Sequence, residues 1–232
     1  MTANGSSPRS GELLRSLRTA RSAAVGGLVF AVSIALVFYL YRSSFPTDDY
    51  LSPTAPLPSP ETLDRVGLAL NLIPYACIAF IWFMAALNYN IGYADHRLFT
   101  TVFLSSGIVL VGLLCVAGAV AGGEVSALAG GLQDTPGVRA MSGLTVSQLF
   151  MNYSARMAAV FCLSVSTFGR INRLLPTWLA VFGTLSGLVL LLVPFGVPYV
   201  AYVFPTWVAV LSIWLFIADP GGKWRAATAR AD

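Results

Sequence analysis

Arg156 is the residue whose type and position most directly suggest chemistry. It lies in the apolar stretch 151–161, where we expect a membrane-spanning helix, and none of the predicted spans contains an Asp or Glu to pair with it. A charge at membrane depth is costly, so such residues are candidates for a functional site. The guanidinium stays charged and donates hydrogen bonds in a planar fork, which suits a carboxylate or a phosphate.

Neutral polar residues accompany Arg156 at helical spacing. Gln148, Asn152 and Arg156 stand at i, i+4 and i+8, which places them on one helix face. The second predicted span carries Asn71 and Tyr75 four residues apart. We therefore predict one outward-opening pocket for an amphiphilic anion, formed by Arg156, Asn152, Gln148, Asn71 and Tyr75.

Backbone chemistry adds an acceptor to this predicted pocket. Pro74 cannot donate a backbone hydrogen bond, which frees the carbonyl of Leu70.

A structural role for Arg156 remains an alternative to the ligand hypothesis. Helical side chains tilt toward the helix N-terminus, so Arg156 can reach the outer surface by snorkelling. Buried polar groups also hold membrane helices together.

The other reactive side chains give little evidence of a catalytic or metal site. Cys77, Cys115 and Cys162 fall in three different apolar segments without metal-ligand spacing, so we expect small buried side chains. His96 is the single histidine, and its neighbours Asp95 and Arg97 suggest an ion pair anchoring a turn. The sequence contains no phosphate loop, nucleophile elbow or zinc motif. We predict no catalytic residue, no metal, no cofactor and no enzymatic activity.

The elements that position these residues follow from composition. The 232 residues are 56% hydrophobic and only 10% charged, which is typical of a protein dissolved in lipid. The net charge of +4 comes from residues flanking apolar runs, without the aromatic–basic interleaving of a nucleic-acid surface. The lipid bilayer is the predicted partner, and nucleic acid is not.

A span needs about 20 apolar residues. This predicts an all-α bundle of six transmembrane helices, within a domain 22–218, at about 22–41, 66–87, 98–121, 149–169, 174–193 and 199–218.

The remaining segments are loops and tails. The tails are predicted at 1–21 and 219–232, and their outer parts, 1–10 and 221–232, are too polar and too rich in small residues to fold alone. Prolines predict an extended outer loop at 42–65, and glycines predict an irregular loop or short interfacial helix at 122–148. Pro205 is expected to kink the last span. Gly118-x-x-x-Gly122 and Gly183-x-x-x-Gly187 are expected to pack within the bundle.

Charge bias predicts the orientation. With the N-terminus inside, ten of the fourteen Lys and Arg residues lie on the cytoplasmic side and three in outer loops, so both termini are predicted to be cytoplasmic.

Four segments, 71–83, 95–107, 156–161 and 175–180, resemble a group of uncharacterised actinobacterial integral membrane proteins. The resemblance covers roughly 65–218 and implies a multi-pass protein of a bacterial inner (plasma) membrane. It supplies no catalytic residue.

Two functions follow. The first is a non-enzymatic accessory or scaffold subunit of a cell-envelope complex, with other membrane proteins or further copies of the chain as partners. The second is a transporter or binder of an amphiphilic anion or anionic lipid at Arg156. An intramembrane enzyme is a third hypothesis, for which the sequence offers few reactive groups.

Overall fold

The computed structural model describes residues 8–44, 58–91, 97–131, 136–193 and 197–217, and every element in them is helical. In chain order these are α1 (Pro8–Ser44), α3 (Pro60–Ile91), α4 (Arg97–Ala129), α5 (Pro136–Ser147), a π-helical segment η1 (Gln148–Tyr153), α6 (Ser154–Ile171), α7 (Thr177–Leu192), a 3-10 segment η2 (Pro198–Tyr202) and α8 (Val203–Ile217).

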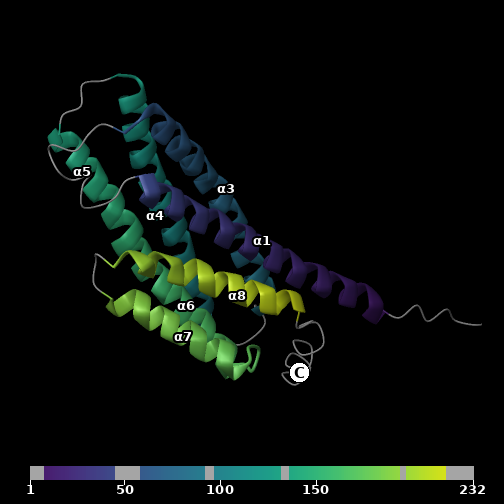
Figure 1. Ribbon diagram of the computed structural model, residues 1–232. Coiled ribbons are helices and arrows are strands. Elements are labelled where there is room, and N and C mark those ends of the chain that lie inside the picture. Colours follow the sequence, from purple (N-terminus) through teal and green to yellow (C-terminus); the bar gives the residue numbers. More distant parts are fainter. Residues whose placement is uncertain (1–7, 45–57, 92–96, 132–135, 194–196, 218–232) are drawn as a thin grey trace, which may run out of the picture.

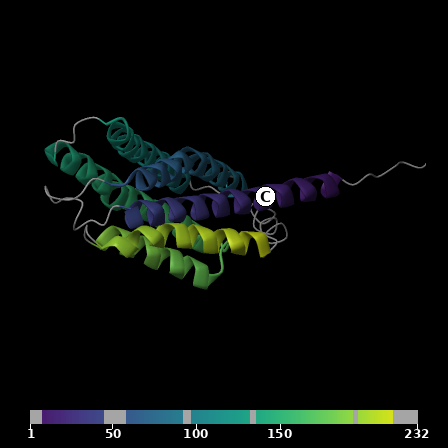
Figure 2. The same cartoon turned by 45° about the horizontal axis from the view of Figure 1, so that its top comes forward.

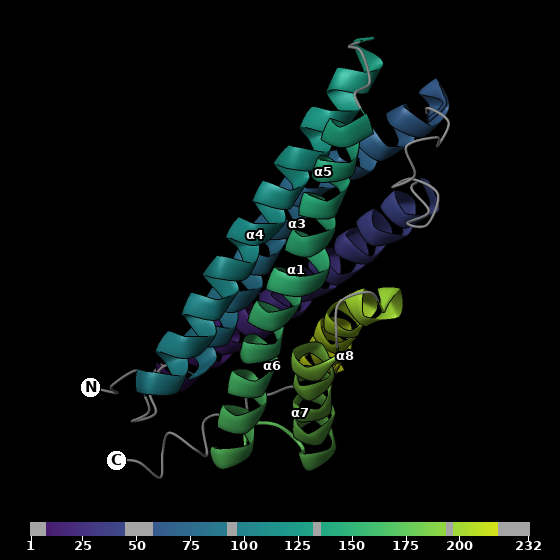
Figure 3. The ribbon, with the colours of Figure 1, turned by 90° about the vertical axis from the view of Figure 1, so that its left-hand side faces the viewer.

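The helices form a closed ring. Each long helix packs against its neighbour in sequence, from α1 to α3, α4, α6, α7 and α8, and α8 packs back against α1. Figure 1 shows α8 beside α1 and α7 beside α6, and Figure 2 shows α1 extending past the bundle at its N-terminal end. Successive helices run in opposite directions, so the start of α1 and the end of α8 lie at the same end (Figure 3).

Five helical segments are long and apolar enough to cross a membrane: Ser22–Ser43, Pro60–Asn88, Thr100–Ala129, Ala140–Ile171 and Tyr199–Ile217. The fifth predicted span, 174–193, corresponds to α7, whose apolar helix Thr177–Leu192 covers only 16 residues, or about 24 Å. The all-α, multi-pass architecture is thus confirmed, with five full-length candidate spans and one shorter apolar helix.

Helices occupy much of what the sequence suggested was loop. In the predicted outer loop 122–148, α4 continues to Ala129, and α5 begins at Pro136 and runs through η1 into α6. In the predicted loop 42–65, α3 begins at Pro60, and residues 45–57 lie outside the described structure. The glycines at 122 and 123 lie within α4 and do not interrupt it. As a result, α3, α4 and α5 extend beyond α7 and α8 at one end (Figure 3).

An aromatic cluster fills the centre of the ring. The rings of Phe30 on α1 and Phe80 on α3 lie 4.5 Å apart, and Phe80 lies 5.2 Å from Phe161 on α6. Phe204 on α8 meets Phe161 edge-on at 6.0 Å and stacks on Trp207 at 6.2 Å. Edge-to-face and offset contacts of this kind add stability beyond their area. Four helices are therefore joined at a single level of the bundle.

Pro205 does not kink the last helix internally. The 3-10 segment η2 ends at Tyr202 and α8 begins at Val203, so Pro205 stands in the first turn. Backbone N–H groups of a first turn have no partner within the helix, so proline removes nothing there. The predicted internal kink was wrong for this reason.

Two glycines allow α7 to pack against its neighbours. A Cβ at Gly183 would collide with Ser166 Oγ and with Trp207 Nε1, and a Cβ at Gly187 would lie 2.7 Å from Leu163 Cγ. The Gly183–Gly187 pair thus packs within the bundle, as predicted. Gly118 does the same against Ile73 at 2.9 Å, whereas Gly122 has no neighbour within 4 Å.

The same contacts explain buried hydroxyl groups without conventional partners. Ser166 Oγ and Ser212 Oγ are buried and have no hydrogen bond to any described residue. Ser166 Oγ lies against the Cα of Gly183, and Ser212 Oγ lies in the same way against Gly27 on α1. Weak Cα–H···O contacts recur at helix–helix interfaces and partly satisfy such oxygens. Each pairing requires glycine, because a side chain would displace the hydroxyl group.

Replacing Gly183 tests this close packing. Gly183→Val should lower the free energy of unfolding in mixed micelles by about 1–3 kcal/mol, because overpacking displaces Ser166 and Trp207. Gly112→Val is the matched control, since a Cβ at Gly112 meets nothing within 4 Å. Far-ultraviolet circular dichroism against denaturing detergent measures both. Equal effects of the two substitutions would contradict the packing role.

Candidate functional site

Arg156 lies near the start of α6, within the candidate span Ala140–Ile171. Its side chain is half-buried, and it makes no hydrogen bond or ion pair with any described residue. The candidate span Thr100–Ala129 does contain a carboxylate, that of Glu124, which acts on Tyr41 and forms no ion pair with Arg156. Within the described residues the guanidinium therefore has no charged partner, and in a candidate membrane span an anion beside it would be strongly favoured.

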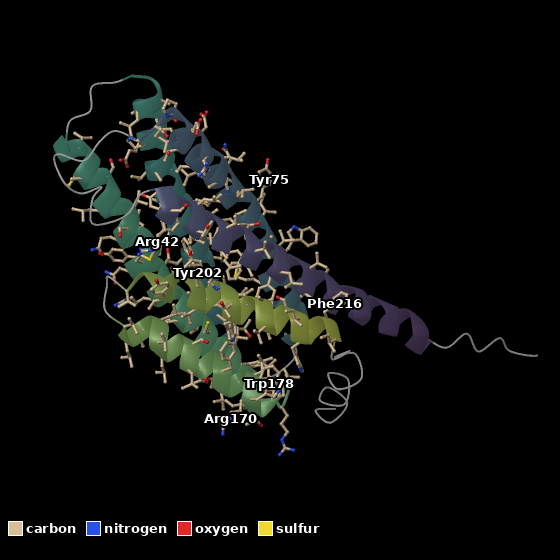
Figure 4. All side chains as sticks on the ribbon, in the orientation of Figure 1. Arg42, Tyr75, Arg170, Trp178, Tyr202 and Phe216 are labelled. Atoms are coloured by element: carbon tan, nitrogen blue, oxygen red, sulfur yellow. The ribbon has the colours of Figure 1, made fainter. Side chains whose placement is uncertain are left out.

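Contacts between helices fix how deep Arg156 lies. The ring of Phe150, six residues before Arg156, packs 6.3 Å from Tyr41, the residue before Arg42 near the end of α1. At 1.5 Å per residue, Arg156 is about 9 Å further into the bundle than this level. Arg170, near the end of α6, is 14 residues from Arg156, or about 21 Å along the helix, and Figure 4 shows it far from Arg42. Arg156 is therefore closer to the Arg42 end.

A π-helical segment leads into this site. Gln148–Tyr153 form η1, and Ser154 reinforces the wider turn, because its Oγ donates to the carbonyl of Leu149 at 2.7 Å. Asn152 Nδ2 donates to Gln148 Oε1 at 3.0 Å, which confirms that these two side chains share a face. Single π turns inside α-helices occur frequently at functional sites.

The π segment also improves the alignment of the polar face. Eight residues overshoot two α-helical turns of 3.6 residues by about 0.8 residue. A wider turn absorbs about one residue. Arg156 therefore lies more directly below Gln148 and Asn152 than in an uninterrupted α-helix. We call these three residues the polar stripe.

Asn71 and Tyr75 do not join the polar stripe. Phe80 on α3 and Phe161 on α6 meet at 5.2 Å, and both helices run from the same end. From this shared level Asn71 is nine residues away, about 14 Å, and Arg156 is five residues away, about 8 Å. Asn71 is exposed, and Tyr75 is 68% exposed and points away from the bundle (Figure 4). Their ligand-binding role stays a prediction, without the shared pocket.

Asn71 instead lines a groove between α3 and α4. This α3–α4 groove has a volume of about 350 Å³, within the range of small-ligand pockets. Pro74 lies inside α3 and lines the groove together with Leu70, so the carbonyl that Pro74 frees is beside it. The groove is lined by Gly67, Leu70, Asn71, Ile73, Pro74, Cys115, Gly118, Ala119, Gly122, Val125 and Ser126. It contains no residue of the polar stripe.

The centre of the bundle, by contrast, is nearly filled. A cavity lined by Ile34, Leu114, Ala155 and Leu190, among others, has a volume of only about 30 Å³. This is room for about one water molecule, and apolar cavities of that kind stay dry. A site for a larger molecule is therefore at the periphery of the ring.

The cysteines differ in part from the expectation of small buried side chains. Cys77 and Cys162 are buried, but Cys115 is exposed, and its thiol lies 3.7 Å from that of Cys77. Among the described residues, no three His, Cys, Asp or Glu side chains lie close enough together to hold a metal ion. His96 and Asp95 lie outside the described residues.

Three features of the structure were not predicted from the sequence. A π segment has no recognised sequence pattern, and the thiol pair joins residues 38 positions apart on separate helices. The α3–α4 groove had a partial signal, because Gly67, Gly118 and Gly122 remove side chains from a helix interface. That signal does not distinguish close packing, as at Gly118, from open space, as at Gly122.

Comparison with known proteins gives no relative: no family model, no curated protein and no solved structure matches this chain.

Substitutions in the polar stripe separate a structural from a ligand-binding arginine. Arg156→Gln should change the free energy of unfolding in mixed micelles by less than about 0.5 kcal/mol, because no described side chain depends on it. Asn152→Leu removes the hydrogen bond to Gln148 and should cost about 0.6 kcal/mol. Unfolding in a denaturing detergent measures both. A loss above about 1.5 kcal/mol for Arg156→Gln would mean a structural partner.

Proposed function

We propose that this protein is a multi-pass membrane protein that binds an amphiphilic anion at Arg156, a binding role that needs no catalytic residue at this site. One observation carries the proposal. Arg156 is half-buried, its backbone lies about 9 Å inside the level of Phe150 and Tyr41, and its side chain has no partner among the described residues. A carboxylate or phosphate on a hydrocarbon tail satisfies both the charge and the apolar surroundings.

The rest of the polar stripe supports this assignment. Asn152 already uses one N–H to hold Gln148, so both side chains are oriented before a ligand arrives. Their remaining donors can bind the outer oxygens of a headgroup while Arg156 binds the anionic oxygens. Because the central cavity is small, the tail would lie along the outside of the ring. This arrangement favours binding over a central transport pathway.

We also propose six spans, with both termini in the cytoplasm of a bacterium and the Arg156 site nearer the outer leaflet. The bias of ten cytoplasmic against three outer basic residues supports this orientation. A tilted or locally thinned bilayer accommodates the shorter α7.

An accessory or scaffold role is the second candidate. On α4, a Cβ added at Gly112, Gly122 or Gly123 would meet nothing within 4 Å. Glycine in membrane helices commonly allows another helix to approach. This open face would suit a helix of another subunit or of a second copy of the chain.

Lipid retention tests the Arg156 site. Wild-type protein and Arg156→Gln are reconstituted in nanodiscs of phosphatidylglycerol and phosphatidylcholine, released into mild detergent and analysed by native mass spectrometry. We expect the wild type to retain phosphatidylglycerol and Arg156→Gln to lose at least about tenfold in occupancy, because the charge-assisted hydrogen bonds are lost. Arg42→Gln, an exposed arginine at the end of α1, is the matched control.

Three outcomes have separate meanings. Equal retention by wild type and Arg156→Gln would refute the anion site. Equal losses of phosphatidylglycerol for Arg156→Gln and Arg42→Gln would show that retention depends only on general surface charge. A protein subunit that co-purifies in fixed stoichiometry with both variants would favour the scaffold role.

Single-cysteine labelling tests the orientation. In a variant without the three native cysteines, Ser59→Cys should react with a membrane-impermeant maleimide in intact cells, and Arg230→Cys only after lysis. Both positions lie in predicted non-membrane segments, so the reagent can reach either. Labelling of Arg230→Cys from outside would contradict the six-span topology.

A further inference from the structure

Two thiols from different helices meet beside the α3–α4 groove. Cys115 Sγ lies 3.7 Å from Cys77 Sγ, although the residues are 38 positions apart in sequence. Cys77 is buried, whereas Cys115 is exposed and lines the groove. The remaining cysteine, Cys162, is buried on α6 and has no such neighbour among the described residues. The groove thus exposes the thiol of Cys115, and the buried thiol of Cys77 lies directly beside it.

The pair is close enough to form a bond after small side-chain movements. A disulfide needs an Sγ–Sγ distance of about 2.0 Å, so the two sulfurs must approach by about 1.7 Å. The helices are already in close contact nearby, because Ile73 occupies the space beside Gly118. Because Cys115 is the exposed member of the pair, its side chain is the one that moves in the proposed bond formation.

The surroundings define what can oxidise this dithiol. The groove lies between two candidate membrane spans, so an oxidant reaches it from the lipid. None of the lining residues is charged, which excludes recognition of an ionic reagent. At about 350 Å³ the groove holds a small ring system.

Asn71 supplies the polar contact for such a molecule. Its exposed carboxamide lines the groove and makes no hydrogen bond to a described residue. The NH₂ group can donate to a carbonyl oxygen. Asn71 is six residues from Cys77, about 9 Å along α3, a separation that a ring with two carbonyl oxygens can bridge.

We propose that the α3–α4 groove binds a lipid-soluble quinone and that the Cys77–Cys115 dithiol reduces it. Both S–H bonds break and one S–S bond forms. Two electrons and two protons pass to the two carbonyl oxygens of the quinone, which becomes the hydroquinone. A quinone is neutral, dissolves in hydrocarbon and accepts this number of electrons and protons. The product disulfide links α3 to α4 inside the membrane.

Thiol counting tests the reaction on the full-length protein. Reduced wild type in lipid nanodiscs is treated with duroquinone, whose fully substituted ring cannot add to thiols, and is then denatured and labelled with maleimide. We expect two of the three thiols to be lost and the unlabelled mass to fall by about 2 Da, the two hydrogens of one disulfide. Cys115→Ser should keep both remaining thiols, and Cys162→Ser should still lose two.

A groove-filling variant tests whether the quinone acts from the groove. Gly122→Leu places a side chain into the groove where a Cβ meets no neighbour, so the fold should tolerate it. We expect oxidation by duroquinone to slow by at least about tenfold, because the ring no longer reaches the thiols. Gly112→Leu is the matched control on the same helix, since it is equally open but does not line the groove.

The proposal fails in either of two cases. Retention of all three thiols in the wild type would show that the pair is not oxidised by a quinone. Equal oxidation rates for Gly122→Leu and Gly112→Leu would show that the groove is not the binding site.

Discussion

The aromatic contacts around Phe80 and Phe161 are the interaction on which the rest of the structure depends. In a membrane, helices gain little from burying apolar surface, so packing must hold them together. Phe30, Phe80, Phe161 and Phe204 join α1, α3, α6 and α8 at one level. That shared level fixes the height of every helix relative to the others, and so the depth of Arg156 and of Asn71.

Around this cluster, glycines determine where two helices pack closely and where a space remains between them. Gly27 and Gly183 allow hydroxyl groups of neighbouring helices to lie against their Cα atoms, and Gly118 does the same for Ile73. Gly122 lacks any such neighbour, and the α3–α4 groove remains beside it. The polar stripe and the Cys77–Cys115 pair thus lie on different parts of the ring, so the two proposed sites are separate.

Much of the fold could be predicted, because an apolar run long enough to span a membrane can adopt few backbone structures there other than a helix. The helical segments, the separation of α7 from α8 and the Gly183–Gly187 packing follow from such runs and from glycine spacing. The boundaries were less accurate at 122–148, where residues 122–129 and 136–148 are helical, and at Pro205, which lies in the first turn of α8 instead of bending that helix. At Pro205 the position of the helix start explains the difference, because a first-turn residue needs no backbone donor.

The sequence by itself determined a multi-pass helical membrane protein with a lone arginine at membrane depth and a polar face formed by Gln148 and Asn152. These follow from composition and helical periodicity, which are local properties. Only the tertiary structure decided that Asn71 and Tyr75 lie apart from Arg156, that a π segment aligns the polar stripe, and that two distant cysteines meet. Those outcomes depend on the relative heights and rotations of helices, which packing between side chains sets and residue spacing within one helix cannot specify.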